Sequence, residues 1–228
     1  MARGISSSSV YDTPFPRRRI LQLAAAGAFG AAGVSGLIAQ VLAQGRNREG
    51  VNSVSGEVLV NGKPAKPGTP VEAGDRVRTS RRSNATVVVG DDAFMLRANS
   101  EVAFSGSKSR VVEMKVESGG VLSVFGRKAV DIKAQNATIG IRGTGAYVEC
   151  MDSRVYFCLC YGEAQVTGPG YAGRTVQTRQ HEEPLFLEEK GGVLTVVPGP
   201  FLNHTDDELI LLEGLVGRQV PFTTPYPG

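Results

Sequence analysis

The hydrophobic pattern of the chain is one of short apolar runs separated by turn-forming residues, from Val54 to Val197. The first run leads into Asn61-Gly62, a dipeptide typical of a two-residue β-hairpin turn. A later run turns back through Gly90-Asp91-Asp92. Many short strands at such close spacing predict an all-β fold. A sandwich, a roll and a solenoid-like stack all fit this spacing.

The strands are placed by runs of Val, Ile, Leu, Phe and Thr, residues that favour β-structure. They lie at 57–60, 85–89, 93–96, 102–104, 111–116, 121–125, 130–132, 137–141, 146–150 and 155–161. Further runs of the same type lie at 175–178, 185–187 and 193–197. No run before residue 203 has a helical period.

Only the C-terminus has a helical pattern. Thr205 and Glu208 have the spacing of a capping box, in which each side chain bonds the other residue's backbone N–H. The residues that follow place four apolar side chains on one face: Leu209, Leu212, Leu215 and Val216. Gly217 and Pro221 mark the end of the helix. We expect one short amphipathic helix docked on the β domain, followed by a disordered or extended Pro-rich tail.

The first 43 residues have the parts of an export signal. Arg17 and Arg18 form a pair, and Ile20 and Leu21 follow after one residue, which is the twin-arginine pattern. An uncharged run rich in Ala and Gly then ends at Ala43, where we expect cleavage. The alternative is a retained membrane anchor, because about 20 apolar residues can span a bilayer. Cleavage would release the protein into the periplasm, whereas retention would anchor it to the inner membrane, facing the periplasm.

The charge of the chain is concentrated in this leader. The whole sequence has 25 basic and 22 acidic residues, a net charge of +3. Residues 1–43 hold four arginines and one aspartate, so 25 − 4 = 21 basic and 22 − 1 = 21 acidic residues remain after cleavage. A mature chain without net charge does not indicate a nucleic-acid partner, which favours a basic domain or face.

These patterns divide the chain into four segments. We expect a signal peptide at 1–43, a polar linker at 44–53, a β domain with a β extension at 54–200, and a helix with a Pro-rich tail at 201–228.

The β segment resembles the FecR-like periplasmic domain. The resemblance rests on the segments 56–58, 71–79, 83–89, 117–121 and 137–145, the last reading Ala-Thr-Ile-Gly-Ile-Arg-Gly-Thr-Gly. It implies an all-β module that senses or relays a state of the envelope. Well-known members regulate iron uptake by passing a signal from an outer-membrane receptor to a sigma factor.

The N-terminus departs from that pattern. Those regulators carry a cytoplasmic anti-sigma domain before a membrane span, whereas sixteen residues precede the arginine cluster here. We therefore expect a periplasmic binding or signalling module without an anti-sigma domain of its own. Its expected partner is an envelope protein or polymer, and no cofactor is implied.

Residues suited to catalysis are scarce. His181 and His204 are the only histidines, and they form neither a Ser-His-Asp arrangement nor a His-Glu-x-x-His motif. The sequence therefore predicts that the protein is not an enzyme.

A metal or redox site is the alternative hypothesis. Cys158 and Cys160 point to the same face if they lie on a strand, as two soft ligands of a transition metal would. His181 and His204 fall near loops that can close on that side. Cys150 joins the pair only if a three-residue loop follows it, since a loop of two or four residues turns it away. Buried thiols and a disulfide are the competing interpretations.

Overall fold

The computed structural model describes residues 49–224 and 226. All of them belong to one compact unit. Arg17, Arg18, Ile20, Leu21 and Ala43 lie outside the described residues, so the export signal, its cleavage and the anchor stay predictions. Within residues 49–224 and 226, no helix is long and apolar enough to cross a membrane.

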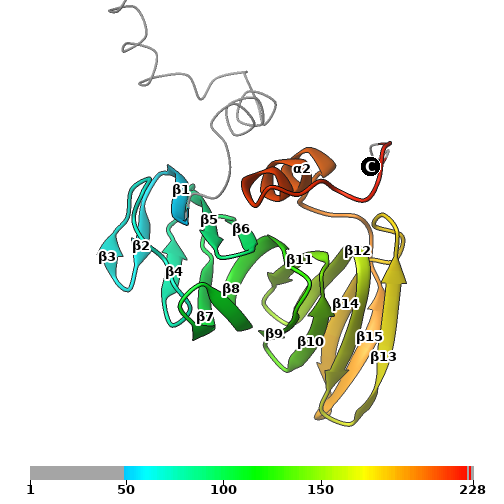
Figure 1. Cartoon of the computed structure of the whole chain (residues 1–228). Helices are drawn as coiled ribbons and strands as arrows, with labels where there is room; N and C mark the ends of the chain where they lie inside the picture. The colour runs from blue at the N-terminus through cyan, green and yellow to red at the C-terminus, as the bar shows by residue number, and fades with distance from the viewer. Residues whose placement is uncertain (1–48, 225, 227–228) are drawn as a thin grey trace, which may run out of the picture. The chain divides into compact units, whose positions relative to one another are not determined.

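The described part consists of strands and one C-terminal helix, which confirms the predicted fold class (Figure 1). The strands are β1 (Gly50–Ser55), β2 (Val58–Val60), β3 (Lys63–Pro64), β4 (Arg76–Thr79), β5 (Asn84–Val89), β6 (Asp92–Leu96), β7 (Glu101–Ser107), β8 (Arg110–Val124), β9 (Ala129–Ala134), β10 (Ala137–Arg142), β11 (Gly145–Cys150), β12 (Arg154–Gly168), β13 (Tyr171–Thr178), β14 (Leu185–Lys190) and β15 (Val193–Pro198). The helix is α2 (Asp206–Leu215).

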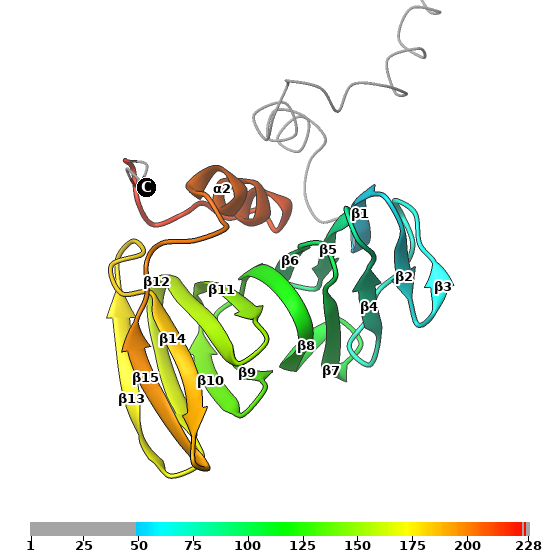
Figure 2. The same cartoon turned by 180° about the vertical axis from the view of Figure 1, so that it is seen from behind.

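Two facing sheets share the long strands β8 and β12 (Figures 1 and 2). The half of β8 after Ser118 pairs with β6 and β11, and the half of β12 before Gly162 pairs with β11 and β14. These halves belong to sheet A, together with β1, β5 and β15. The other halves pair with β7, β9, β10 and β13 in sheet B, which β2, β3 and β4 complete. All these pairings are antiparallel except that of β8 with β9.

The continuous strands β8 and β12 differ from the sequence prediction. The sequence predicts separate strands at 111–116 and 121–125, and a strand at 155–161 that ends before Gly162. Instead, each long strand bends from one sheet into the other. Gly119 has φ +68° and Gly162 has φ +99°, in the left-handed region that favours glycine. These glycines therefore mark bends within a strand, not the turns between strands.

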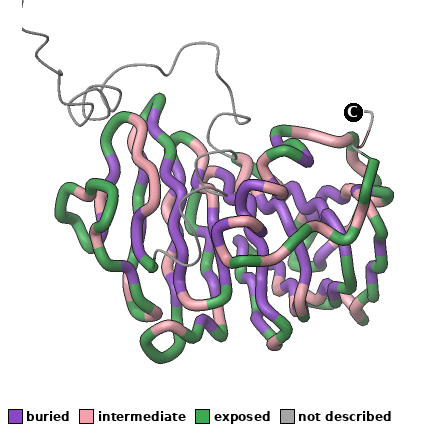
Figure 3. Tube along the Cα trace, turned by 45° about the horizontal axis from the view of Figure 1, so that its top comes forward, coloured by how far each residue is buried: buried purple, intermediate pink, exposed green. Residues whose placement is uncertain are grey.

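The main core lies between the two sheets, and a second apolar cluster covers the outer face of sheet A. Along β12, Val155, Phe157 and Leu159 point into the main core, while Tyr156 and Cys158 point to the opposite face. Because both faces of this strand are covered, its apolar run is continuous. In sheet B the strand β9 alternates buried and exposed residues, as expected for a sheet with one solvated face. Figure 3 shows the buried positions concentrated in the strands.

Helix α2 lies over the outer face of sheet A. Thr205 and Glu208 form the predicted capping box. Leu209, Leu212 and Leu215 pack into the outer cluster of sheet A, which confirms the predicted docking face. Arg97 fixes the start of the helix, because its Nη1 and Nη2 donate to the two carboxylate oxygens of Glu208 at 2.6 Å each.

Two predictions about the ends of the domain are wrong in part. The predicted linker 44–53 overlaps β1, which begins at Gly50 and pairs with β5 through backbone hydrogen bonds. The predicted tail has no helix or strand at residues 218–224, but it packs against the sheet. The rings of Phe222 and Tyr161 lie 6.2 Å apart, so apolar burial holds this segment in place.

Candidate metal centre

Cys158 and Cys160 lie on β12 and point to the outer face of sheet A. Both are fully buried. Their shared orientation confirms the prediction from the two-residue period of a strand. Leu159 lies between them and points the other way, into the main core.

Cys150 does not belong to this group. Four residues, 151–154, connect it to Val155, its partner across β11 and β12. Cys150 therefore faces away from the other two cysteines and packs against the main core. Burial raises the pKa of its thiol to about 11. All three cysteines are free thiols in the structure, which does not support the alternative interpretation as a disulfide.

His181 and His204 close over the two thiols from different parts of the chain. His181 follows β13, and its backbone N–H donates to the carbonyl oxygen of Cys160 at 3.1 Å. His204 lies between β15 and α2, directly before the helix cap. The two side chains are 0% and 4% exposed, so water is excluded from both. The structure thus brings together all four residues of the metal hypothesis.

The four ligand atoms form a compact group. One ligand atom from each of the four residues lies within 4.8 Å of the other three. His181 Nδ1 is 3.2 Å from His204 Nε2 and 3.5 Å from Cys158 Sγ. A tetrahedral zinc site has nitrogen–nitrogen and nitrogen–sulfur separations of about 3.3 and 3.5 Å, given its usual bond lengths. These two separations therefore fit tetrahedral coordination of a single ion.

Each histidine also binds an acceptor outside the group. His181 Nε2 is 2.8 Å from Asp206 Oδ1, and His204 Nδ1 is 2.7 Å from the carbonyl oxygen of Leu202. Carboxylate and carbonyl oxygens accept hydrogen bonds, so they place a proton on each of these nitrogens. Metal-binding histidines commonly donate their second N–H in this way, which fixes the tautomer and the ring orientation.

These hydrogen bonds leave His181 Nδ1 and His204 Nε2 as the inward-facing nitrogens. Two neutral rings would then direct their lone pairs at each other across 3.2 Å, which is repulsive. A positive group between them removes the repulsion. It can be a proton on His181 or a metal ion, and the two thiols make the second possibility chemically suitable.

The protonation of the group favours soft-metal binding. Hydrogen bonding with Cys160 has the largest effect on the pKa of Cys158. Together with hydrogen bonds to His181 and His204, it lowers this pKa to about 4, although burial acts to raise it. Burial raises the pKa of Cys160 well above its usual value. Burial acts to lower the pKa of His181, but hydrogen bonds to Cys158 and Asp206 outweigh it and raise this pKa. The lowered pKa of Cys158 favours its thiolate, which is the form that binds metals.

Asp206 is a residue of this centre that the sequence analysis did not identify. It is the first residue of α2, where a negative charge is favourable beside the helix N-terminus. Its Oδ2 accepts from Gln180 Nε2 at 2.7 Å and from the backbone N–H of Tyr226 at 2.5 Å. The carboxylate is therefore held by three groups and cannot rotate freely away from His181.

Aromatic rings enclose the centre. Tyr147 stacks on His204 with ring centroids 4.8 Å apart and an interplanar angle of 15°. Phe201 and Tyr226 pack on His181 at 4.7 and 5.4 Å. This apolar surrounding excludes water and strengthens electrostatic interactions inside the group.

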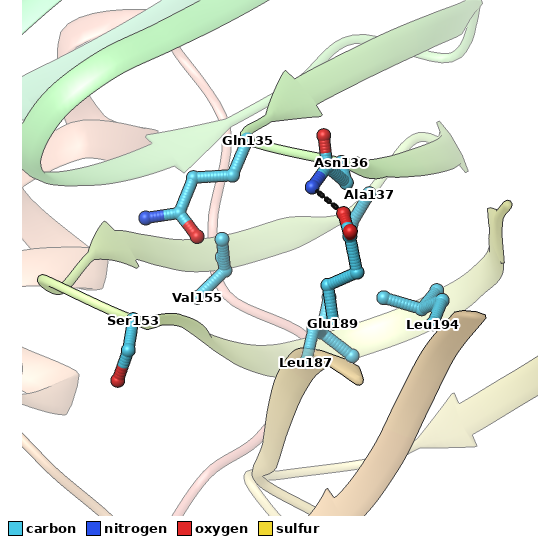
Figure 4. Close-up of a pocket in the computed structure, with 8 residues that line it drawn as sticks. All are labelled: Gln135, Asn136, Ala137, Ser153, Val155, Leu187, Glu189 and Leu194. Atoms are coloured by element: carbon cyan, nitrogen blue, oxygen red, sulfur yellow. Dashed lines mark hydrogen bonds between the residues drawn. The ribbon is translucent and has the colours of Figure 1, made fainter. Parts of the chain in front are cut away.

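A separate pocket of about 260 Å³ lies where the β9–β10 turn meets β12, β14 and β15 (Figure 4). Three of its four polar side chains are engaged with neighbours. Asn136 Nδ2 donates to Glu189, and Gln135 Nε2 donates to the carbonyl oxygen of Met151 at 2.7 Å. Glu189 is the only titratable residue that lines it among the described residues, so this pocket does not resemble a reactive site.

Comparisons with known proteins give little beyond these observations. No protein-family model and no curated protein matches the chain. Two crystal structures of a candidate anti-sigma factor from Parabacteroides distasonis align with 54% of this chain and 59% of theirs. Both have a TM-score of 0.45, at 12% and 14% sequence identity. Such values are too low to assign a function, and the FecR-like resemblance stays a prediction.

Proposed function

We propose that this protein binds one zinc ion through Cys158, Cys160, His181 and His204. The proposal is carried by one observation: four buried ligand atoms of suitable chemistry lie within 4.8 Å, and each histidine is oriented by an outer acceptor. Two Cys and two His form a recurrent ligand set of closed zinc sites.

The charge balance favours a divalent ion. Two thiolates and a divalent cation sum to zero, and a neutral group is the easiest to bury in apolar surroundings. A monovalent copper ion would leave one negative charge in the centre, next to the carboxylate of Asp206. Zinc also suits the tetrahedral sulfur and nitrogen arrangement.

The proposed role of the ion is structural. Four protein ligands fill the coordination of zinc and leave no position for a substrate or a reactive water molecule. The ion would join β12 of sheet A to the segment before α2, two parts that are distant in sequence. We therefore propose a non-enzymatic protein in which the metal fixes the C-terminal segment to the β domain.

The wider setting that we propose is that of a periplasmic binding or signalling module acting on an envelope protein or polymer. The supporting observations are the twin-arginine pattern at Arg17 and Arg18, the FecR-like segments and the balanced charge after residue 43. A pull-down from periplasm followed by mass spectrometry tests this setting, and recovery of no specific partner would contradict it.

Metal content tests the zinc site directly. The full chain is purified without chelators under reducing conditions, and its metals are measured by inductively coupled plasma mass spectrometry. We expect about one zinc ion per chain, because the four ligands form one closed site. The Cys158→Ser and Cys160→Ser variants should lose it, since a hydroxyl is a poor replacement for a thiolate.

Cys150 provides the matched control. It lies on the neighbouring strand, but its thiol faces the main core. Cys150→Ser should keep the full metal content. A wild-type chain that stays metal-free after addition of zinc, or an equal loss in the Cys150→Ser variant, would show that the proposal is wrong.

A further inference from the structure

A second cavity lies between the β domain and the chain that follows α2. It has a volume of about 660 Å³, and three arginines line it: Arg127, Arg179 and Arg218. They come from the segments after β8, β13 and α2, which are distant in sequence. Figure 1 shows the segment after α2 returning towards the end of β13.

The cavity has an excess of positive charge. Glu213 is the only acidic residue among those that line it. Both of its oxygens are engaged, since Tyr161 donates its hydroxyl to Oε1 and Arg218 Nε donates to Oε2 at 2.6 Å. Glu213 therefore balances Arg218 and leaves the charges of Arg127 and Arg179 unbalanced within the cavity.

Arg127 and Arg179 are free to bind a ligand. Within the described part of the chain, neither guanidinium group has a hydrogen bond or an ion pair. The acidic neighbour of Arg179 is Glu182, whose carboxylate is already bound by the Thr178 hydroxyl and the Arg179 backbone N–H. Arginine side chains are well suited to bidentate binding of carboxylate and phosphate groups.

Arg218 has a donor without an acceptor. Its Nε binds Glu213, and its Nη1 donates to the carbonyl oxygen of Asp91 at 2.5 Å. Its Nη2 is buried and has no partner among the described residues. Buried polar atoms are nearly always hydrogen-bonded, so Arg218 keeps an unsatisfied charged donor next to the wall of this cavity.

Apolar side chains complete the walls. Phe125, Tyr161, Pro221 and Phe222 line the same cavity. Its volume lies in the usual range of small-molecule sites, roughly 300–1,000 Å³. The chemistry that fits such walls is an anionic group attached to an apolar ring or chain.

We infer that this cavity binds an organic oxyanion, a carboxylate or a phosphate that carries an apolar group. Arg127 and Arg179 contact the oxyanion, the positive charge of Arg218 adds to the field of the cavity, and Phe222 packs on the apolar part. The inference does not rest on the proposed zinc site, because none of these residues is a ligand of that site.

Ligand titration of the full chain tests the inference. The probes are benzoate and phenyl phosphate, with benzyl alcohol as the neutral analogue and inorganic phosphate as the anion without an apolar part. Calorimetry gives the affinities, and amide NMR shifts of Gly143, Gly162 and Thr224 locate the binding. We expect at least one of the two organic anions to bind more tightly than both reference probes, and the preferred one distinguishes a carboxylate ligand from a phosphate ligand.

Variants at the exposed arginines test the role of charge. The double variant Arg127→Gln/Arg179→Gln should weaken binding about tenfold or more, since it removes two charge-assisted contacts. Arg78→Gln, an exposed substitution on β4, should leave the affinity unchanged. Unchanged melting temperatures of the variants would exclude misfolding as the cause of a weaker affinity. Equal binding of benzyl alcohol, no binding at about 10 mM probe, or no effect of the double variant would overturn the inference.

Discussion

Asp206 accepts a hydrogen bond from His181 at 2.8 Å, although 25 residues separate them in the sequence. The contact joins the first residue of α2 to the loop after β13. It orients a ring whose other nitrogen faces two buried thiols. One hydrogen bond thus links the first residue of helix α2 to a candidate metal ligand.

We expect Asp206→Asn to weaken zinc binding by about 10- to 100-fold, the usual effect of losing an outer-shell partner. The side chain keeps its size, but it loses the negative charge that supports the ring of His181. Competition with a chelator measures the affinity. A cobalt-substituted sample should keep a tetrahedral absorption spectrum, because Asp206 positions a ligand and is not one itself.

The control is Asp207→Asn, which alters the next, exposed residue in the same helical turn. It changes the helix-terminal charge in the same way but has no contact with His181. An equal loss of affinity in both variants would attribute the effect to the helix terminus and not to the hydrogen bond.

Removal of the metal should lower the melting temperature. A ligand that binds only the folded state at 1,000 times its Kd adds about 4 kcal/mol, which corresponds to roughly 10 °C for a domain of this size. Calorimetry with and without a chelator measures the shift. Hydrogen exchange should increase most in α2, since His204 and Asp206 lie at its start.

The Cys158→Ser variant is the reference for this measurement. It should melt at one temperature whether or not the chelator is present, because it has no site to empty. A chelator-dependent shift in this variant would mean that the stabilising ion binds elsewhere.

The bend in β12 should depend on Gly162. A Cβ atom there would lie 2.7 Å from Thr144 Cγ2, and φ is +99°. We expect Gly162→Ala to destabilise the fold by about 2–4 kcal/mol, since left-handed backbone strain and overpacking add together. Urea unfolding measures the loss.

Gly191 is the matched position for this prediction. It also has a positive φ, of +62°, but no atom lies within 4 Å of an added Cβ. Gly191→Ala should therefore lose only the backbone part, about 1–2 kcal/mol. Equal losses at both positions would exclude the close approach of Thr144 as a cause.

Replacing Arg17 and Arg18 with lysine should abolish export if the twin-arginine pattern acts as predicted. Cell fractionation with N-terminal sequencing measures the result, and the wild-type chain should begin at Gln44. Undiminished periplasmic protein in the variant would show that another route is used. Full-length wild-type protein in the membrane fraction would favour the retained anchor.

The sequence predicts local features of this protein well. The two-residue period of a β-strand places Cys158 and Cys160 on one face of the strand, and the spacing of Thr205 and Glu208 predicts the helix cap. Both depend on neighbours along the chain. The sequence pattern divides the two long strands at the wrong points because Gly119 and Gly162 resemble turn residues, although each only bends its strand.

The assembly of the candidate metal centre depends on tertiary contacts that the spacing of residues along the sequence does not encode. The sequence places His181 and His204 near loops that can close on the side of the thiols, but their approach to the thiols depends on how β13 and β15 pack. In the sequence, Asp206 has the position of an acid in the first turn of the predicted helix, and it has this position in the structure as well. Its second role follows from tertiary structure, since the segment before α2 folds back over sheet A.

The alternation along β12 has a consequence for folding. A shift of this strand by one residue would turn Phe157 and Leu159 towards the histidines and both thiols into the main core. Only the native register places two sulfur atoms opposite two imidazole rings. An ion bound there would thus stabilise the correct strand pairing and not the shifted one. Metal binding would therefore favour the native register of β12 during folding.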